Sequence, residues 1–198
     1  MRVVDICISL IGLILTSPLL AFAAIAIKLD SKGPVLFRQQ RVGQNFKLFE
    51  IYKFRTMYVA GPAQGGPITQ RNDARITRVG AFLRRWKIDE LPQLFNVLKC
   101  DMSLVGPRPE VPKYVEMFRA EYADILAVRP GLTDPASIQY IDESKFLAVA
   151  DDPELEYVKV ILPRKLKIAR DYLASRSLMT DLRLVVLTLW KLVRESHE

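Results

Sequence analysis

The sequence predicts a mostly helical α+β protein with one membrane-inserted segment and one small β-hairpin. Three observations lead to this prediction: an uncharged N-terminal stretch, two β-like runs around the turn Gly43-Gln44-Asn45, and amphipathic helical spacing along most of the remaining chain. A chain of 198 residues is long enough for one domain. We expect residues 1–30 to form the membrane helix, and residues 31–198 to form one integrated domain lying on the membrane surface.

The N-terminal segment carries no charged residue from Ile6 to Ile27. As a helix this stretch would be roughly 33 Å long, enough to cross a hydrocarbon core of about 30 Å. It is too long for the apolar region of a cleaved signal peptide, and Asp5 stands where such a peptide is positive. We therefore expect the segment to remain part of the protein.

Ser17-Pro18 interrupts this segment near its middle. A proline removes one helical hydrogen bond and pushes on the carbonyl of Ile14, and the hydroxyls of Thr16 and Ser17 are placed to supply a partner for that freed carbonyl. Two interpretations remain open: a kinked spanning helix, or a re-entrant helix whose two ends face the same side. Positive residues flank both ends, which suits the second interpretation: Arg2 on one side and Lys28, Lys32, Arg38 and Arg41 on the other.

The elements expected after the hairpin are mainly helices. Residues 58–74 are rich in Gly, Pro and Gln and predict a loop. Apolar periodicity predicts helices over 76–87, from Asp89 to about 99, over 111–127, over 154–175 and over 178–194. The amphipathic pattern, with basic faces and with Trp86 and Trp190, suits ordinary core packing and also suits interfacial helices on an anionic bilayer.

The formal net charge of +7 and the pI of about 9.5 point to an anionic partner. Nucleic acid is a poor candidate because the sequence contains no recognisable nucleic-acid-binding motif. Two cysteines make neither a metal-binding pattern nor a disulfide framework, and the single histidine, His197, stands beside the C-terminus. Any catalysis must therefore depend on carboxylates, lysines, arginines or a metal ion.

The stretch "KIDELPQ" places Asp89 and Glu90 side by side in a basic neighbourhood that includes Arg84 and Arg85. One interpretation is structural, with Asp89 capping the helix that follows. The other is chemical, because an ionised aspartate is a competent nucleophile toward phosphorus and a neighbouring glutamate could hold Mg²⁺. Both interpretations use the same position at a helix start, so the pair alone does not separate them.

Further basic residues stand in rigid settings suited to phosphate. Lys53 and Arg55 belong to "YKFRTM", Arg108 lies between two prolines, and Arg129 precedes Pro130-Gly131. The sequence has no Gly-rich phosphate-binding loop and no dinucleotide-binding motif. A phosphate site would therefore be built from side chains.

Six motifs in order resemble the bacterial sugar transferase family, the monotopic phosphoglycosyl transferases that use polyprenyl phosphate. They are an apolar segment with Ser17-Pro18, "GPVLFRQQRVG", "YKFRTM", "LRRWKIDELPQLFNVLKCDMSLVGPRPE" and "RPGLT", the fourth of which contains two, and they cover residues 1 to about 135. The length resembles that of the minimal members, which consist of the catalytic domain alone.

The resemblance implies transfer of a sugar-1-phosphate from a UDP-sugar to polyprenyl (undecaprenyl) phosphate in the cytoplasmic leaflet of the bacterial inner membrane, with release of UMP. It implies Asp89 as the nucleophile that carries the phosphosugar, Asp89 and Glu90 as the Mg²⁺ site, and a re-entrant helix broken at Ser17-Pro18. It also implies that Arg108 binds nucleotide or phosphate. Supporting roles are expected for Lys53, Arg55, Glu110 and Arg129.

The chain departs from the pattern of many members after "RPGLT", where it reads "DPASIQY", Asp134 to Tyr140. We expect this departure to concern the sugar side of the site, and the sequence does not name the sugar. Two competing hypotheses are a membrane-anchored binding module without turnover and a basic nucleic-acid-binding protein, and an intact Asp-Glu pair argues against the first. A homodimer and a monomer are both left open.

Overall fold

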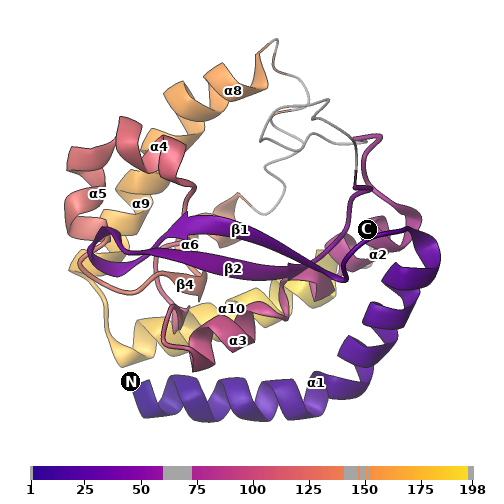
Figure 1. Ribbon diagram of the computed structural model, residues 1–198. Helices are drawn as coiled ribbons and strands as arrows, with labels where there is room; N and C mark the ends of the chain where they lie inside the picture. The colour runs from indigo at the N-terminus through magenta and orange to yellow at the C-terminus, as the bar shows by residue number, and fades with distance from the viewer. Residues whose placement is uncertain (1, 60–72, 141–146, 148–149, 151, 196–198) are drawn as a thin grey trace.

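A computed structural model describes the chain except for residue 1 and residues 60–72, 141–146, 148–149, 151 and 196–198. The fold is mostly helical with a small hairpin and an N-terminal apolar helix, as the sequence predicts, and it has a second two-stranded sheet (Figure 1). Most of the loop predicted over 58–74 lies outside the described residues, and so does His197.

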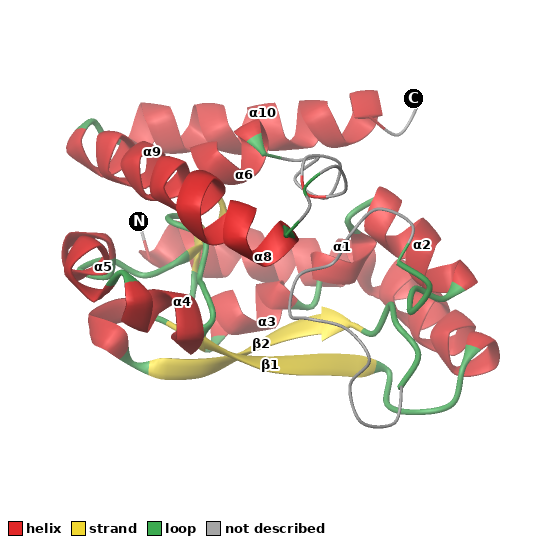
Figure 2. Ribbon diagram, turned by 90° about the horizontal axis from the view of Figure 1, so that it is seen from above, coloured by secondary structure: helices red, strands yellow, loops and turns green. Residues whose placement is uncertain are grey.

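The elements follow one another in a simple order. The first half contains α1 (Arg2–Asp30), β1 (Leu36–Val42), β2 (Leu48–Phe54), α2 (Arg78–Arg85), a 3₁₀ turn (Ile88–Glu90), α3 (Gln93–Leu98) and β3 (Ser103–Val105). The second half contains α4 (Pro112–Met117), α5 (Arg119–Ile125), β4 (Gly131–Thr133), α6 (Pro135–Gln139), α8 (Pro153–Glu156), a π-helical segment (Tyr157–Ile161), α9 (Leu162–Ala174) and α10 (Leu178–Glu195). Seen from above, the hairpin lies on one side of the molecule and α9 and α10 lie on the other (Figure 2).

The hairpin confirms the predicted turn. Strands β1 and β2 pair antiparallel, from Leu36 opposite Phe54 to Val42 opposite Leu48. The connection is a 3₁₀ turn over Gln44–Phe46, in which Asn45 has φ of 53°. Asparagine tolerates this left-handed backbone better than most residues, which explains its place in the turn.

A second, parallel pair of strands was not predicted. Strand β3 pairs with β4, with Ser103 opposite Gly131 and Val105 opposite Thr133. The two segments come so close at the end of β3 that a Cβ on Gly131 would lie 2.1 Å from the backbone nitrogen of Gly106. Both glycines therefore serve a close backbone approach between segments that are distant in sequence.

Helix α1 is the single helix within the described residues that is long and apolar enough to cross a membrane. It changes direction sharply along its length (Figure 1), and Pro18 lies inside it. The Ser17 hydroxyl donates to the carbonyl of Ile14 at 2.8 Å, and the Thr16 hydroxyl donates to that of Gly12 at 2.7 Å. The Ser17 bond confirms the predicted compensation for the proline, because Ile14 carries the carbonyl that Pro18 leaves without its helical donor; the Thr16 bond serves another carbonyl.

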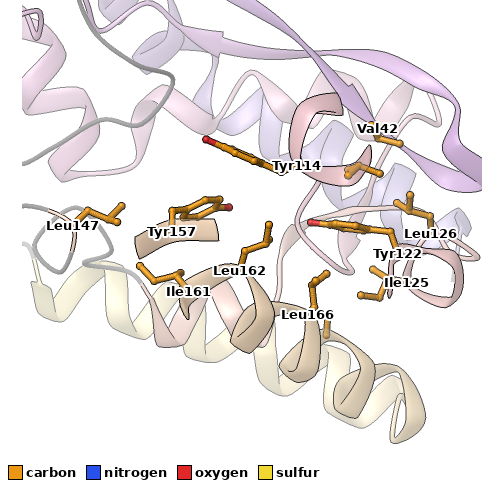
Figure 3. Packing of buried hydrophobic residues seen from close by; sticks show 12 residues of the cluster. Val42, Tyr114, Tyr122, Ile125, Leu126, Leu147, Tyr157, Ile161, Leu162 and Leu166 are labelled. Carbon is orange, nitrogen blue, oxygen red and sulfur yellow. The ribbon is translucent and has the colours of Figure 1, made fainter. Parts of the chain in front are cut away.

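The two arms of α1 pack against different groups of buried side chains. Leu13 on the first arm joins a cluster with residues of α3, β2 and β3, including Val97 and Leu104. Ala23 and Ile27 on the second arm pack against Phe54 of β2 and Leu83 of α2. A third cluster lies between α4–α5 and α9 and contains Tyr114, Tyr122, Tyr157 and Leu162 (Figure 3). The globular part of the molecule thus supports α1 on both sides of its break.

Two predicted helices are less regular than the sequence suggests. The helix predicted over 111–127 is divided at Phe118, whose φ of −122° and ψ of 37° are not helical. The helix predicted over 154–175 contains a π-helical segment, Tyr157–Ile161, just before Pro163. A proline has no N–H to bond the preceding turn, which suits the wider π-helical turn at this point.

Candidate active site

The turn between α2 and α3 carries Asp89 and Glu90. Helix α2 begins after Thr77, whose hydroxyl accepts a bond from the backbone nitrogen of Gly80 at 2.9 Å. Lys87 then adopts a left-handed conformation, with φ of 53°, and the 3₁₀ turn over Ile88–Glu90 follows it. The two carboxylates therefore stand on a separate turn that follows α2.

Asp89 does not cap a helix. The residue before α3 is Pro92, and no side chain caps either α3 or the 3₁₀ turn. The Asp89 side chain is buried, with the residue 7% exposed, and its Oδ1 atom has no hydrogen-bond partner among the described residues. Burying an unpartnered carboxylate oxygen is costly, so the structural interpretation of "KIDELPQ" leaves this atom unexplained.

Glu90 is held by two cations that come from distant segments. Lys53 on β2 places its Nζ 2.8 Å from Glu90 Oε1. Arg108, between the prolines of the 106–110 loop, places Nη2 2.5 Å from Oε1 and Nη1 3.3 Å from Oε2. Bonds from charged donors to a carboxylate are among the stronger hydrogen bonds in proteins. The fold thus brings together three of the residues predicted to form the site.

The pKa values of the two adjacent carboxyl groups are shifted in opposite directions. Burial, reinforced by the negative charge of Glu90, raises the pKa of Asp89 to about 6. Burial also opposes the ionisation of Glu90, but Arg108 and Lys53 outweigh it and hold the pKa of that carboxyl well below its usual value. Burial lowers the pKa of Lys53, and the charge of Glu90 opposes that shift. Glu90 is therefore a fixed anion, while Asp89 changes charge near neutral pH.

Arg84 is the third cation of the site. Its Nε donates to the hydroxyl of Thr56 at 2.8 Å, and its charge acts on both Asp89 and Asp73. Burial lowers the pKa of Arg84, which still remains cationic at neutral pH. Thr56 was not singled out in the sequence, although it belongs to "YKFRTM" directly after Arg55; a neutral hydroxyl carried no signal of its own.

Arg55 lies away from the carboxylate pair. It is 5% exposed, and its guanidinium donates to the carbonyls of Ser31 at 2.7 Å, Lys32 at 2.5 Å and Ile27 at 3.4 Å. These carbonyls lie in the last turn of α1 and directly after it, where the helix dipole favours a cation. In this structure Arg55 therefore caps the C-terminal end of α1.

The other predicted residues also have their own partners. Glu110 accepts bonds from Arg41 at 3.0 Å and from the Tyr157 hydroxyl at 2.5 Å, which joins β1 to the π-helical segment. Arg129 donates to the carbonyl of Cys100 at 3.1 Å. Arg85 is exposed in the last turn of α2. The bonds described here for Glu110 and Arg129 lead to other partners than Asp89 and Glu90.

The donor set fits a hard divalent cation such as Mg²⁺. Asp89 Oδ1 is the open carboxylate oxygen, whereas both oxygens of Glu90 already accept bonds from cations. Among the described residues, no group of three or more His, Cys, Asp or Glu side chains could hold a metal. Mg²⁺ in phosphate chemistry typically takes one or two carboxylates and completes its shell with water and substrate oxygens. The site could meet that requirement through Asp89, with Glu90 exchanging one of its cationic partners.

Residues 1–195 match the model of the family described as "Bacterial sugar transferase". The chain belongs to the bacterial sugar transferase family. Within it, the chain is 41% identical over 193 residues to the UDP-N-acetylgalactosamine-undecaprenyl-phosphate N-acetylgalactosaminephosphotransferase of Aeromonas hydrophila. It is 40% identical over 190 residues to the UDP-glucose:undecaprenyl-phosphate glucose-1-phosphate transferase of Caulobacter vibrioides. It is 39% identical over 195 residues to the undecaprenyl-phosphate glucose phosphotransferase of Komagataeibacter xylinus.

These alignments include almost the whole of this bacterial sugar transferase but only part of some relatives. They cover 95% of the chain against the Aeromonas and Komagataeibacter proteins and 94% against the Caulobacter protein. The chain spans 42% of the Aeromonas protein, 35% of the Komagataeibacter protein and 67% of the Caulobacter protein. The described site therefore lies in the part of the sequence that these relatives share with the chain.

Proposed function

We propose that this chain transfers a sugar-1-phosphate from a UDP-sugar to undecaprenyl phosphate and releases UMP. The relatives named above for undecaprenyl-phosphate sugar transfer support the reaction class. The observation that carries the proposal is the unequal pair of carboxylates: Asp89 with an unpartnered buried oxygen, beside Glu90 clamped by Lys53 and Arg108. A binding module without turnover would have no use for a buried carboxylate oxygen that accepts no hydrogen bond.

In the first step, an oxygen of ionised Asp89 attacks the phosphorus that carries the sugar. The bond from this phosphorus to the bridging oxygen breaks, UMP leaves, and an aspartyl phosphosugar remains. In the second step, an oxygen of undecaprenyl phosphate attacks the same phosphorus and displaces the Asp89 carboxylate. Both steps conserve charge and atoms, and the nucleophile is regenerated.

The surrounding residues favour this chemistry electrostatically. Lys53 and Arg108 hold Glu90, and we propose that their remaining N–H groups donate to the oxygens of the diphosphate. Arg84, fixed by Thr56, adds a third positive charge beside Asp89. Preorganised cations stabilise the negative charge that develops on the transferring phosphoryl group. Mg²⁺, held by Asp89 and Glu90 with substrate oxygens, would neutralise diphosphate charge at the same place.

We further propose that α1 is re-entrant, with both ends on the cytoplasmic side of the inner membrane. Arg2 at its start donates to the carbonyls of Val97 at 2.7 Å and Met102 at 3.2 Å. At its other end, Arg55 caps the helix, and Asp30 accepts a bond from the backbone nitrogen of Val79 at 3.2 Å. Both ends are thus tied to one globular body, which supports the re-entrant interpretation over a spanning one.

The lipid-facing surface proposed for α1 is the outside of its bend. Several large apolar side chains there are exposed, with Ile14, Leu15 and Phe22 between 63% and 74% exposed.

Helix α10 adds a second exposed apolar face, formed by Leu178, Met179, Leu182, Val186, Leu189 and Trp190. We propose that α10 lies at the membrane interface as an amphipathic helix. Together these faces would hold the catalytic domain against one leaflet.

The deciding experiment is intact-mass measurement of the purified protein after incubation with Mg²⁺ and a panel of UDP-sugars, without lipid acceptor. We expect the mass of one phosphosugar to be added with the preferred donor, and no addition in Asp89→Asn or Asp89→Ala. Adding undecaprenyl phosphate should remove the adduct and give the lipid-linked product. UDP-sugar binding without either adduct or UMP release across the panel would contradict the proposal.

A further inference from the structure

Asp134 follows β4 and is the first residue of "DPASIQY", the stretch that departs from the common family pattern. It is 2% exposed, and each of its carboxylate oxygens accepts a bond from a backbone N–H. Oδ1 accepts from Ser137 at 2.6 Å and thereby caps α6. Oδ2 accepts from Arg108 at 3.0 Å, in a segment 26 residues earlier. One side chain thus joins a helix start to the loop that carries Arg108.

The loop around Arg108 is also held through its carbonyls: Arg41 Nη1 donates to the carbonyl of Pro109 at 3.1 Å, and the backbone nitrogen of Val42 donates to that of Glu110 at 3.0 Å. The nitrogen of Gly106 donates to the carbonyl of Thr133 at 3.1 Å, and that of Gly131 donates to the carbonyl of Pro107 at 2.9 Å. Pro107 and Pro109 have no N–H group, so the segment Pro107-Arg108-Pro109 has a single backbone donor. That donor is the N–H of Arg108, and Asp134 is the residue that accepts from it.

We propose that Asp134 is a positioning residue for the transfer reaction, because by holding the backbone of Arg108 it aims the guanidinium at Glu90. The inference rests on the proposed function. The Arg108 side chain is 36% exposed, so burial alone does not immobilise it. Two flanking prolines make the local backbone stiff; the carbonyls of Pro107 and Pro109 are held on either side, and the bond to Asp134 holds the peptide of Arg108 itself between them.

The alternative is that Asp134 only caps α6. A serine separates the two possibilities, because serine is also a good N-cap and can accept from the N–H of Ser137. Its single short hydroxyl has no second oxygen for Arg108. Asp134→Ser should therefore preserve the cap and remove the link to the Arg108 loop.

Asp152 offers a matched control elsewhere in the chain. It caps α8, with Oδ1 accepting from the backbone nitrogens of Glu154 and Leu155, each at 3.0 Å. The structure describes no bond from Asp152 to the site. Asp152→Ser changes the same residue type at the same kind of helix start, and we expect it to leave turnover unchanged.

The first test measures turnover of the full chain in lipid nanodiscs with the preferred UDP-sugar and undecaprenyl phosphate. We expect Asp134→Ser to lower kcat by about tenfold or more, as misplaced catalytic groups commonly do, with little change in apparent Tm. In an Arg108→Lys background, the two guanidinium bonds to Glu90 are already lost. There the same substitution should lower kcat much less. Wild-type kcat in Asp134→Ser, or additive losses in the double variant, would overturn the proposal.

The second test does not depend on activity. Hydrogen exchange over residues 107–109 reports on one amide, that of Arg108, because the flanking residues are prolines. We expect this amide to exchange faster in Asp134→Ser and to remain protected in Asp152→Ser. Unchanged protection would refute the link itself, even if no donor in the panel supports turnover. Faster exchange without any turnover in the wild-type protein would instead locate the failure in the proposed function.

Discussion

Asp89 is buried beside a second carboxylate, and this makes its charge depend on pH close to neutrality. Its pKa of about 6 means that the carboxylate is largely protonated at pH 5 and largely ionised at pH 7. Because only the ionised form is a nucleophile, the rate of adduct formation should rise with pH, with a midpoint near 6. Single-turnover measurement of adduct by mass, between about pH 5 and 8, checks this profile. A flat profile across that range would contradict the assignment of Asp89 as the nucleophile.

Burial of an ionised Asp89 should also cost the protein stability. The folded-state pKa lies above the unfolded value of 3.8, so the folded state binds more protons between these values, and stability falls as pH rises through about 6. A shift of this size corresponds to about 3 kcal/mol at most. Asp89→Asn should therefore abolish the adduct yet raise the apparent Tm at pH 7.5. This gain should shrink at pH 5, where Asp89 is mostly neutral, and thermal denaturation at both pH values measures it.

Lys53 should act on both carboxylates at once. Lys53→Met removes the cation 2.8 Å from Glu90, and it also removes a charge that lowers the pKa of Asp89. Loss of a hydrogen bond between charged groups costs about 1.5–3 kcal/mol, so adduct formation should slow by roughly 10- to 100-fold. The midpoint of the pH profile should also move above that of the wild-type protein. A slower reaction with an unmoved midpoint would indicate that Lys53 acts on the substrate alone.

At the scale of single elements, Arg55 is the clearest difference between the sequence-based expectation and the structure. The sequence suggested phosphate binding, but the guanidinium caps α1. Arg55→Met should leave several carbonyl groups without their donor and destabilise the fold by roughly 3 kcal/mol. For a chain of this length that corresponds to a fall in Tm of about 6–12 °C. The KM for the UDP-sugar should stay the same, as steady-state kinetics below the unfolding temperature would show.

The elements that the sequence predicted well are those with local causes. The hairpin turn at Gly43-Gln44-Asn45 and the hydroxyl compensation at Pro18 depend on residues within a few positions of one another. The β3–β4 pair was missed because strands of three residues show no periodicity, and Gly106 and Gly131 suit turns as well as a close approach. Lys53, Glu90 and Arg108 were each predicted for the site, but their meeting depends on tertiary packing.

At the scale of the whole molecule, one framework connects α1, the site and α10. Asp5 of α1 accepts a bond from the backbone of Leu104 on β3 at 3.4 Å, and Thr188 of α10 bonds to Thr133 on β4 at 2.6 Å. The loop of Arg108 follows β3, and Asp134 follows β4. The parallel strands β3 and β4 therefore connect α1 and α10 to the loop of Arg108, whose guanidinium binds Glu90. Such a framework would hold the carboxylates at a set position relative to the bilayer.

The two tryptophans can report whether these surfaces meet one membrane plane. Trp86 lies just after α2 and is 40% exposed, and Trp190 on α10 is 53% exposed. Figures 1 and 2 both place α2, the second arm of α1 and the C-terminal end of α10 toward the same end of the molecule.

Because the chain contains two tryptophans, Trp86→Phe and Trp190→Phe each leave one reporter. In nanodiscs with brominated acyl chains, both reporters should be quenched, since tryptophan favours the membrane interface. Quenching of Trp190 by aqueous iodide but not by brominated lipid would instead show that the apolar face of α10 points away from the bilayer, and it would contradict the proposed interfacial position.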